Sequence, residues 1–337
     1  MSDYIFYPGC SMESSAKAYH ASTLAVCKQL GIGLKEIDDW NCCGATEYLS
    51  LDLIPAYALI ARNLALAEKQ ANSNKAIIAP CSACYLNLAK ADHYMHEDKA
   101  LGTKINDALA AGGLHYDPGK LVIRHLLDVI INEVGLQQVS EKVTKPLKGL
   151  RIAPYLGCML PRPDYAARYS DTEHPFELDS LIASLGATVV DFPLKTHCCG
   201  GHMTQIGPKT AFELIRRLIA SADKLKADMI VTVCPMCQMN LDAFQGQMND
   251  FFHTNYKMPV LFFTQLMGIA FGEEPEKLGF GSEFVSARPA LGKIGVETPE
   301  MVAEAAAAAK PKKPSGLPMP PPLTKAGIVS VKKEVSE

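Results

Sequence analysis

Ten of the eleven cysteines in this 337-residue chain fall into two copies of one spaced pattern. Each copy has a single cysteine, then an adjacent pair, then two cysteines with two residues between them. The gaps are 31 and 37 residues in the first copy and 39 and 34 residues in the second. The members are Cys10, Cys42, Cys43, Cys81 and Cys84, then Cys158, Cys198, Cys199, Cys234 and Cys237. Five thiols that converge from three distant segments predict a polynuclear metal centre, and two copies predict two centres.

The residues around the cysteines repeat as well, which indicates duplication of a whole fold. Residues 4–12 (YIFYPGCSM) correspond to residues 152–160 (IAPYLGCML). The adjacent pairs lie in matching WNCCG and THCCG segments, and each spaced pair is followed by Asn-Leu at the same distance. We therefore expect one domain at 1–145 and a second at 146–290.

The remaining segment, 291–337, differs in composition from both halves. It is rich in alanine, lysine and proline, and this composition is typical of an extended segment without a core of its own. Two interpretations stay open: a solvated tail, or an arm that lies over a partner subunit.

Within each half, short apolar runs alternate with helical patterns. In the first half we expect strands at 4–7, 34–37 and 76–79, with helices at 14–30 and 54–71. In the second half we expect strands at 151–156, 188–192 and 229–233, with helices at 176–185 and 210–225. This order predicts an α/β fold of two pseudo-twofold-related Rossmann-like domains with parallel sheets. The cysteine segments follow the strands, so the metal sites are expected at the strand carboxyl ends.

Charge and hydropathy narrow the possible partners and compartment. The net charge of −3 gives no general attraction to nucleic acid. The N-terminal residues show no secretory signal, and the apolar stretch 258–272 is too short to cross a bilayer, so we expect no transmembrane segment. The chain is expected to be cytoplasmic, where clustered cysteines serve as ligands or redox groups more often than as structural disulfides.

Zinc and disulfides are the alternatives to iron and sulfide. Structural zinc takes four ligands, so five cysteines in each set leave one over, and adjacent side chains diverge too far to share one ion well. A thioredoxin-like disulfide would use the spaced pair but would explain neither the adjacent pairs nor Cys10 and Cys158. Iron–sulfur chemistry accounts for every member of both sets.

Two other cofactor patterns are missing from the sequence. The usual ferredoxin cysteine run is absent, so electrons are expected to enter from another protein. No Gly-rich nucleotide fingerprint follows a strand, so we expect no flavin or nicotinamide in this chain.

The repeated order of single cysteine, Cys-Cys-Gly and Cys-x-x-Cys resembles the cysteine-rich CCG domain. Two copies without a fused ferredoxin domain resemble the B subunit of heterodisulfide reductase and the corresponding subunits of bacterial complexes of the same type. The resemblance covers about residues 4–275 and is complete in its cysteines. The gap between Cys43 and Cys81 is slightly long for the pattern.

The resemblance implies a specific chemistry. In that family each five-cysteine set holds a noncubane [4Fe-4S] cluster, and a disulfide is split between the two clusters in one-electron steps. Carried over, the five cysteines of each half would hold one cluster. The substrate would be a coenzyme M–coenzyme B type heterodisulfide, a lipoyl-carrier disulfide or another small disulfide or thiol, with the direction of reaction open. The implied partners are the ferredoxin-like C subunit and the flavin-containing A subunit of such a complex.

Two other functions remain as alternatives. One is an electron-transfer subunit of a quinone-linked or other oxidoreductase complex, as in other enzymes with CCG domains. The other is a non-catalytic scaffold that holds zinc.

Several residues near the cysteines have both a functional and a structural interpretation. His197 and His202 flank the second adjacent pair and are candidate proton donors, although a hydrogen bond to sulfur or backbone would also explain them. Lys195 is expected to be a surface lysine. Cys27 is expected to be a small core residue of a helix. His93 and His96 are expected on the solvated face of a helix.

Overall fold

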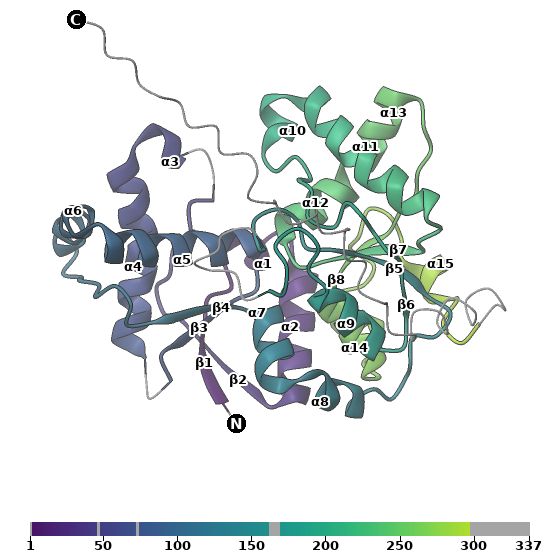
Figure 1. Cartoon of the computed structure of the whole chain (residues 1–337), viewed down its shortest axis with the longest axis horizontal. Helices are drawn as coiled ribbons and strands as arrows, with labels where there is room; N and C mark the ends of the chain where they lie inside the picture. Colours follow the sequence, from purple (N-terminus) through teal and green to yellow (C-terminus); the bar gives the residue numbers. More distant parts are fainter. Residues whose placement is uncertain (1, 46–47, 72–73, 162–168, 297–337) are drawn as a thin grey trace, which may run out of the picture. The chain divides into compact units, whose positions relative to one another are not determined.

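The computed structural model describes residues 2–45, 48–71, 74–161 and 169–296. These residues form two four-stranded sheets, in which every pair of neighbouring strands is parallel (Figure 1). The tail predicted at 291–337 falls outside the described residues from 297 onward.

The first half carries the sheet with strand order β2-β1-β3-β4. Its strands are β1 (Ser2–Phe6), β2 (Ile32–Glu36), β3 (Ala76–Ala79) and β4 (Val122–His125). Its helices are α1 (Cys10–Glu13), α2 (Lys17–Leu30), α3 (Tyr48–Leu51), α4 (Leu53–Gln70), α5 (Ser82–Glu97), α6 (Lys99–Ala110), α7 (Leu126–Val129), the π-helix η1 (Ile130–Val134) and α8 (Leu136–Glu141).

The second half repeats this topology with strand order β6-β5-β7-β8. Its strands are β5 (Arg151–Tyr155), β6 (Thr188–Val189), β7 (Met229–Thr232) and β8 (Val260–Phe262). Its helices are α9 (Glu177–Ser184), α10 (Met203–Ile206), α11 (Pro208–Lys224), α12 (Pro235–Ala243), α13 (Gln245–Phe252), α14 (Phe263–Ala270), the 3-10 helix η2 (Pro275–Leu278) and α15 (Arg288–Leu291).

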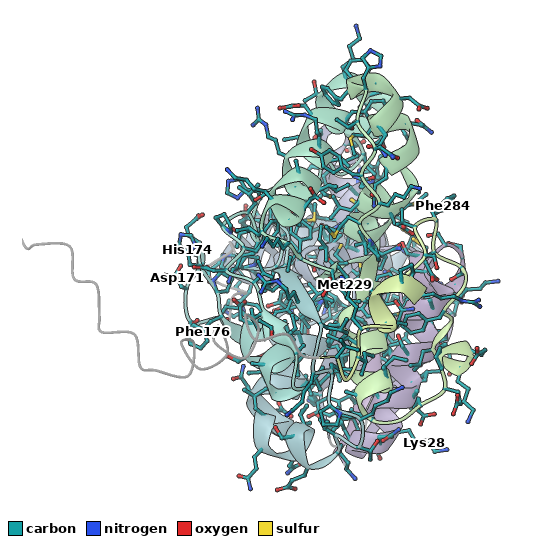
Figure 2. All side chains as sticks on the ribbon, turned by 90° about the vertical axis from the view of Figure 1, so that its right-hand side faces the viewer. Lys28, Asp171, His174, Phe176, Met229 and Phe284 are labelled. Carbon is teal, nitrogen blue, oxygen red and sulfur yellow. The ribbon has the colours of Figure 1, made fainter. Side chains whose placement is uncertain are left out.

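The central strands form the middle of each core. All four residues of β3 and all four of β7 are buried, as expected for parallel strands covered on both faces. Figure 2 shows Met229 of β7 in the interior, whereas Phe176 and Phe284 lie at the surface. Since β1 pairs with β3 as β5 pairs with β7, the loops after these strands occupy equivalent places in the two halves.

The predicted α/β class with parallel sheets in two similar domains is confirmed. The strand expected at 76–79 coincides with β3, and the helices expected at 54–71 and 210–225 correspond to α4 and α11. The sequence patterns did not predict β4 or β8, and the strand expected at 188–192 ends at Val189.

Residues 142–150, between α8 and β5, have no helix or strand, and the boundary proposed at 145/146 falls among them. Past the boundary proposed at 290/291, the Gly295 amide still donates to the Lys148 carbonyl at 2.7 Å. Both boundaries stay proposals. Among the described residues, no helix combines the length and apolar character needed to span a membrane.

Candidate metal centre

Each cysteine segment follows a strand at the same edge of its sheet. In the first half Cys10 begins α1 after β1, the pair 42–43 follows β2, and Cys81 is the N-cap of α5 after β3. The second half repeats this order with Cys158, the pair 198–199 and Cys234, the N-cap of α12. Because the strands are parallel, their carboxyl ends bring the three loops of each half together.

The sulfur atoms of each half lie within contact distance in pairs. In the first half Sγ of Cys10 lies 3.5 Å from that of Cys42, and Sγ of Cys43 lies 3.3 Å from that of Cys84. In the second half the Sγ atoms of Cys199 and Cys237 are 3.6 Å apart. The Gly200 amide donates to Sγ of Cys198 at 3.3 Å. The structure thus brings distant segments of the chain into two groups of thiols.

The two groups meet at Cys81 and Cys234. These residues are the first cysteines of the two Cys-x-x-Cys segments, and their thiols are near enough for each to shift the pKa of the other. Both are buried, at 5% and 2% exposure. The two five-thiol sets therefore share a boundary inside the molecule, which we call the seam.

One sulfur in each set favours the thiolate form, which is the form that binds metals. Hydrogen bonds from the thiols of Cys10 and Cys43 lower the pKa of Cys42 to about 2. Hydrogen bonds from Cys237 and Cys81 likewise hold the pKa of Cys234 well below its ordinary value.

A tyrosine holds each adjacent pair from one side. The hydroxyl of Tyr7 donates to the carbonyl of Asn41 at 2.7 Å, and the hydroxyl of Tyr155 donates to the carbonyl of His197 at 2.6 Å. Asn41 and His197 directly precede the two adjacent pairs. Each tyrosine lies three residues before the single cysteine of its set, so a repeated Tyr-x-Gly-Cys sequence was a signal for this role.

An asparagine on the following helix holds the other side of each pair. Nδ2 of Asn87 donates to the carbonyl of Cys43 at 2.9 Å, and Nδ2 of Asn240 donates to the carbonyl of Cys199 at 3.3 Å. These are the asparagines of the repeated Asn-Leu match. Each adjacent pair is therefore fixed from two directions by equivalent residues, as is common around metal ligands.

Glycine allows the single cysteine to approach the spaced pair. Gly9 and Gly157 have φ of +75° and +72°, in the left-handed region. A Cβ on Gly9 would lie 2.8 Å from Sγ of Cys84, and one on Gly157 would lie 3.1 Å from Sγ of Cys237. A side chain at either position would crowd the sulfur, so both halves need glycine there.

Solvent reaches one side of the site. Cys10, Cys42 and Cys198 are exposed and Cys158 is half-buried, whereas the other six cysteines of the two sets are buried. His197, next to Cys198, is also exposed, and His202 is half-buried at the start of α10. The role of both histidines as proton donors stays a prediction.

Other predicted residues have clear positions. Cys27 is 1% exposed within α2, and burial raises the pKa of its thiol to about 12, which confirms the core interpretation. His93 and His96 lie on α5, and the described part of the chain holds no group of three potential metal-ligating side chains that includes them.

The expectation of a surface lysine at Lys195 is wrong. Lys195 is 6% exposed, and its Nζ lies 2.5 Å from a carboxylate oxygen of Asp179 on α9. The Lys195 carbonyl accepts from the amides of Leu156 and Gly157. The ion pair with Asp179 compensates the charge of Lys195, so this lysine can be buried close to the second cysteine set.

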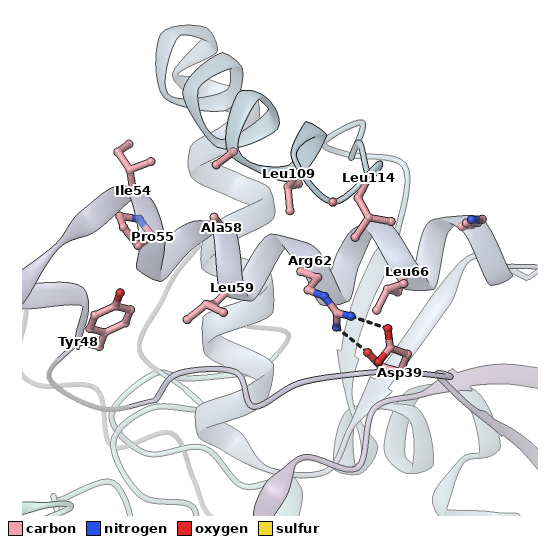
Figure 3. Close-up of a pocket in the computed structure, with 13 residues that line it drawn as sticks. Asp39, Tyr48, Ile54, Pro55, Ala58, Leu59, Arg62, Leu66, Leu109 and Leu114 are labelled. Atoms are coloured by element: carbon pink, nitrogen blue, oxygen red, sulfur yellow. Dashed lines mark hydrogen bonds and ion pairs between the residues drawn. The ribbon is translucent and has the colours of Figure 1, made fainter.

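A cavity of about 740 Å³ lies away from the cysteines, over α4 and α6 (Figure 3). Leu59, Leu66 and Leu109 help to line it, and Arg62 pairs with Asp39 at its edge. No cysteine lines this cavity, so it is not the site of the cysteine chemistry.

The thiol arrangement suits a group larger than one ion. Among the described residues, no three His, Cys, Asp or Glu side chains surround a single ion position. Instead, Cys43 neighbours both Cys42 and Cys84 in the first set, and Cys237 neighbours both Cys199 and Cys234 in the second. The sulfurs of each set therefore form a connected group, as the ligands of a centre with several metal atoms would. A tetrahedral zinc site needs four ligands around one centre, so the five cysteines of each set leave one over, and this count favours an iron–sulfur cluster over zinc.

Comparison with known proteins identifies the two halves. The family described as "Cysteine-rich domain" (CCG) matches residues 4–89 and 152–242. The chain is 33% identical to the 8-methylmenaquinol:fumarate reductase membrane anchor subunit of Wolinella succinogenes, over 85% of this chain and 98% of that protein. It is 29% identical to the B subunit of the ferredoxin:CoB-CoM heterodisulfide reductase of Methanosarcina mazei, over 87% of this chain and 97% of that protein.

Two further similarities agree with this. A protein of Archaeoglobus profundus, named as similar to the B subunit of heterodisulfide reductase, is 29% identical, over 82% of this chain and 93% of that protein. A crystal structure of a hypothetical protein from Helicobacter pylori shares the fold, with a TM-score of 0.67 and 13% identity. The alignment covers 85% of this chain and 52% of that one. Because the family matches more than half of the chain in two copies, the protein belongs to the cysteine-rich CCG domain family, with relatives among the B subunits of heterodisulfide reductase.

Proposed function

We propose that the protein is the disulfide- or thiol-active subunit of a heterodisulfide-reductase-like complex. The observation that carries this proposal is the seam, where two equivalent five-thiol sets meet through Cys81 and Cys234. A disulfide has two sulfurs to be reduced, and two adjacent sets can receive one each. The relatives named as B subunits of heterodisulfide reductase support the same function.

In this proposal each set holds one noncubane [4Fe-4S] cluster. When bound, such clusters supply one-electron exchange and an iron that can accept a substrate sulfur. The thiolates of each set bind the group, while Tyr7 and Tyr155 orient the adjacent pairs and Gly9 and Gly157 allow the close approach.

The reaction must balance two electrons and two protons. Reduction breaks the S–S bond of the substrate, adds one electron to each sulfur and leaves two thiols after each sulfur takes a proton. The electrons come from a partner of the ferredoxin class. We propose His197 as a proton donor because it is exposed beside Cys198, and His202 as a second one near the same pair.

The proposal also implies partners and a compartment. The ferredoxin-like C subunit of such a complex would exchange electrons with the sets, and the flavin-containing A subunit would lie further along the route. The ten ligand thiols must stay reduced, which favours the cytoplasm.

A second function is favoured by one comparison. The 33% identical relative is named as a subunit of a fumarate reductase that uses 8-methylmenaquinol. We propose as the alternative that the chain passes electrons between a quinol and a partner enzyme, without cleaving a disulfide.

The test is purification of the native complex without oxygen, followed by metal analysis and two assays. Iron with acid-labile sulfide and broad visible absorption supports both redox functions, whereas zinc-loaded colourless protein contradicts both. Turnover of a disulfide from a panel, with a low-potential dye as the electron source, supports the first function. Quinol oxidation without any disulfide turnover supports the second.

A further inference from the structure

The carbonyl groups that directly precede Cys81 and Cys234 share a hydrogen-bond donor. Tyr19, on α2 of the first half, is fully buried, and its hydroxyl lies 2.9 Å from the carbonyl oxygen of Pro80 and 3.2 Å from that of Val233. Pro80 belongs to the first half and Val233 to the second. One side chain therefore links the two backbone segments that lead into the seam.

His125, at the end of β4, lies beside the same two carbonyls. Its Nε2 hydrogen-bonds to the carbonyl oxygen of Val233 at 3.3 Å, and the carbonyl of Pro80 is near enough to act on the pKa of the ring. Nδ1 of His125 accepts from the amide of Leu127 at 3.1 Å, so the ring proton lies on Nε2, facing the carbonyls. The seam thus has two donors, both from the first half.

The second half contributes an aromatic ring instead. His125 pairs with Ala79 in the register of the first sheet, and Phe262 pairs with Thr232 at the equivalent place in the second sheet. The ring of Phe262 stacks on that of Tyr19, with centroids 4.2 Å apart and planes 2° from parallel. Equivalent positions in the two sheets therefore hold the seam in different ways.

Helix α2, which carries Tyr19, also hydrogen-bonds to the second half at a point further from the seam. Oγ of Ser22, on α2, lies 2.7 Å from Oγ1 of Thr264 on α14, and both residues are fully buried. The stack and this hydrogen bond keep Tyr19 in place even when its hydroxyl is removed.

We propose that Tyr19 and His125 are positioning residues that fix the separation of Cys81 and Cys234, and through them the separation of the two metal sites. This consequence for the metal sites rests on the proposed function. The S–S bond of a substrate is about 2.05 Å long, so two sites that act on its two sulfurs must keep a defined distance. Errors of about 1 Å in such placement cost about 100-fold in rate.

The first test uses the full chain after removal of metal by a chelator and reductant. Circular dichroism confirms that each protein keeps its fold. A short diamide treatment then oxidises neighbouring thiols, and peptide mapping gives the yield of the Cys81–Cys234 disulfide relative to the Cys43–Cys84 disulfide. The Cys43–Cys84 pair lies within the first half and serves as an internal reference, with sulfurs 3.3 Å apart.

Three variants are compared with the wild type. Tyr19→Phe keeps the stacked ring, and His125→Phe introduces the residue that the second half uses. Tyr116→Phe is the matched control, because its buried hydroxyl donates to Asp92 away from the seam. We expect each seam variant to lower the disulfide ratio by about threefold, and the double variant by about tenfold, while the control leaves it unchanged. A ratio within twofold of wild type in the double variant overturns the proposal.

A second measurement uses the iron-loaded protein. It tests the positioning role of Tyr19 and His125 even if the metal-free chain unfolds. Electron paramagnetic resonance reports the magnetic interaction between the two sites, which falls steeply with distance. The double variant with full iron content is expected to show a changed interaction, and an unchanged spectrum contradicts the proposal. If the native protein holds no iron, the proposed function fails, and the disulfide ratio still tests the positioning role by itself.

Discussion

Tyr7 and Tyr155 perform the same task in the two halves of the protein, since each donates its hydroxyl to the carbonyl that precedes an adjacent cysteine pair, at 2.7 Å and 2.6 Å. Both side chains are fully buried. Duplication has therefore preserved the support of the cysteines together with the cysteines.

Removing one of these hydroxyls should loosen one cysteine set. For Tyr155→Phe we expect a loss of about 1 kcal/mol in the free energy of unfolding, because a buried carbonyl loses its donor. We also expect iron to leave the second set several-fold faster when a chelator is added. Tyr7→Phe should affect the first set in the same way. Equal iron-release curves for wild type and both variants would show that the tyrosines do not support the sets.

Loss of a single cysteine should remove or distort one cluster and spare the other. We expect Cys10→Ala and Cys158→Ala each to contain about half of the wild-type iron and sulfide, because each set lacks one of its five ligands. Cys27→Ala is the control, since Cys27 is buried in α2 and apart from both sets. Full iron and wild-type activity in either ligand variant would refute that ligand assignment.

The buried imidazole of His125 should make the protein less stable in acid. Burial lowers the pKa of His125 to about 4, from an ordinary value of 6.5. Below pH 6.5 the unfolded chain takes up a proton that the folded chain does not, so stability falls as the pH falls towards 4. Between pH 7 and pH 5 this residue should account for a loss of about 2 kcal/mol.

Comparison with His125→Gln isolates that contribution. Asp179 and Asp242 have pKa values raised by burial and titrate with the opposite sign, but they are common to both proteins. The difference in unfolding free energy between wild type and variant should therefore change by about 2 kcal/mol across this range. Two parallel stability curves from denaturant titrations at each pH would contradict the expectation.

Loss of a buried ion pair at the end of β4 should lower the free energy of unfolding more than loss of a surface ion pair. Nε of Arg124 lies 2.5 Å from a carboxylate oxygen of Asp128, and the two side chains are 7% and 4% exposed. Asp128→Ala leaves the guanidinium with less compensation and should cost about 3–5 kcal/mol. Glu213→Ala removes the partner of Arg216 and Arg217 on the surface and should cost less than about 1 kcal/mol. Similar urea midpoints of unfolding for Asp128→Ala and Glu213→Ala would contradict this expectation.

Much of the fold could be predicted because the apolar runs and the cysteines repeat together. The strand at 76–79 is a compact apolar run just before a cysteine, and its position was predicted correctly. In contrast, β4 has the sequence Val-Ile-Arg-His, and its polar residues hide the strand pattern. β8 lies at the start of a long apolar stretch, where nothing in the sequence separates a short strand from the helix that follows.

The surroundings of the site were harder to predict for a different reason. Lys195 is buried by a partner 16 residues away, and a polar loop gives no sign of that pairing. Tyr19 binds carbonyls 61 and 214 residues away, and His125 binds one 108 residues away. Such contacts depend on how the two halves pack, which local patterns do not encode. The ten cysteines remain predicted ligands.

The unlike pair His125 and Phe262 has a consequence for how such a protein can evolve. A homodimer of single halves would carry the same side chain on both flanks of its axis, because each mutation appears twice. Fusing the copies into one polypeptide lifts that restriction, so the histidine and the phenylalanine can diverge independently. The two sides of such a fused protein can therefore adapt separately, so that together they fit a molecule whose two ends differ.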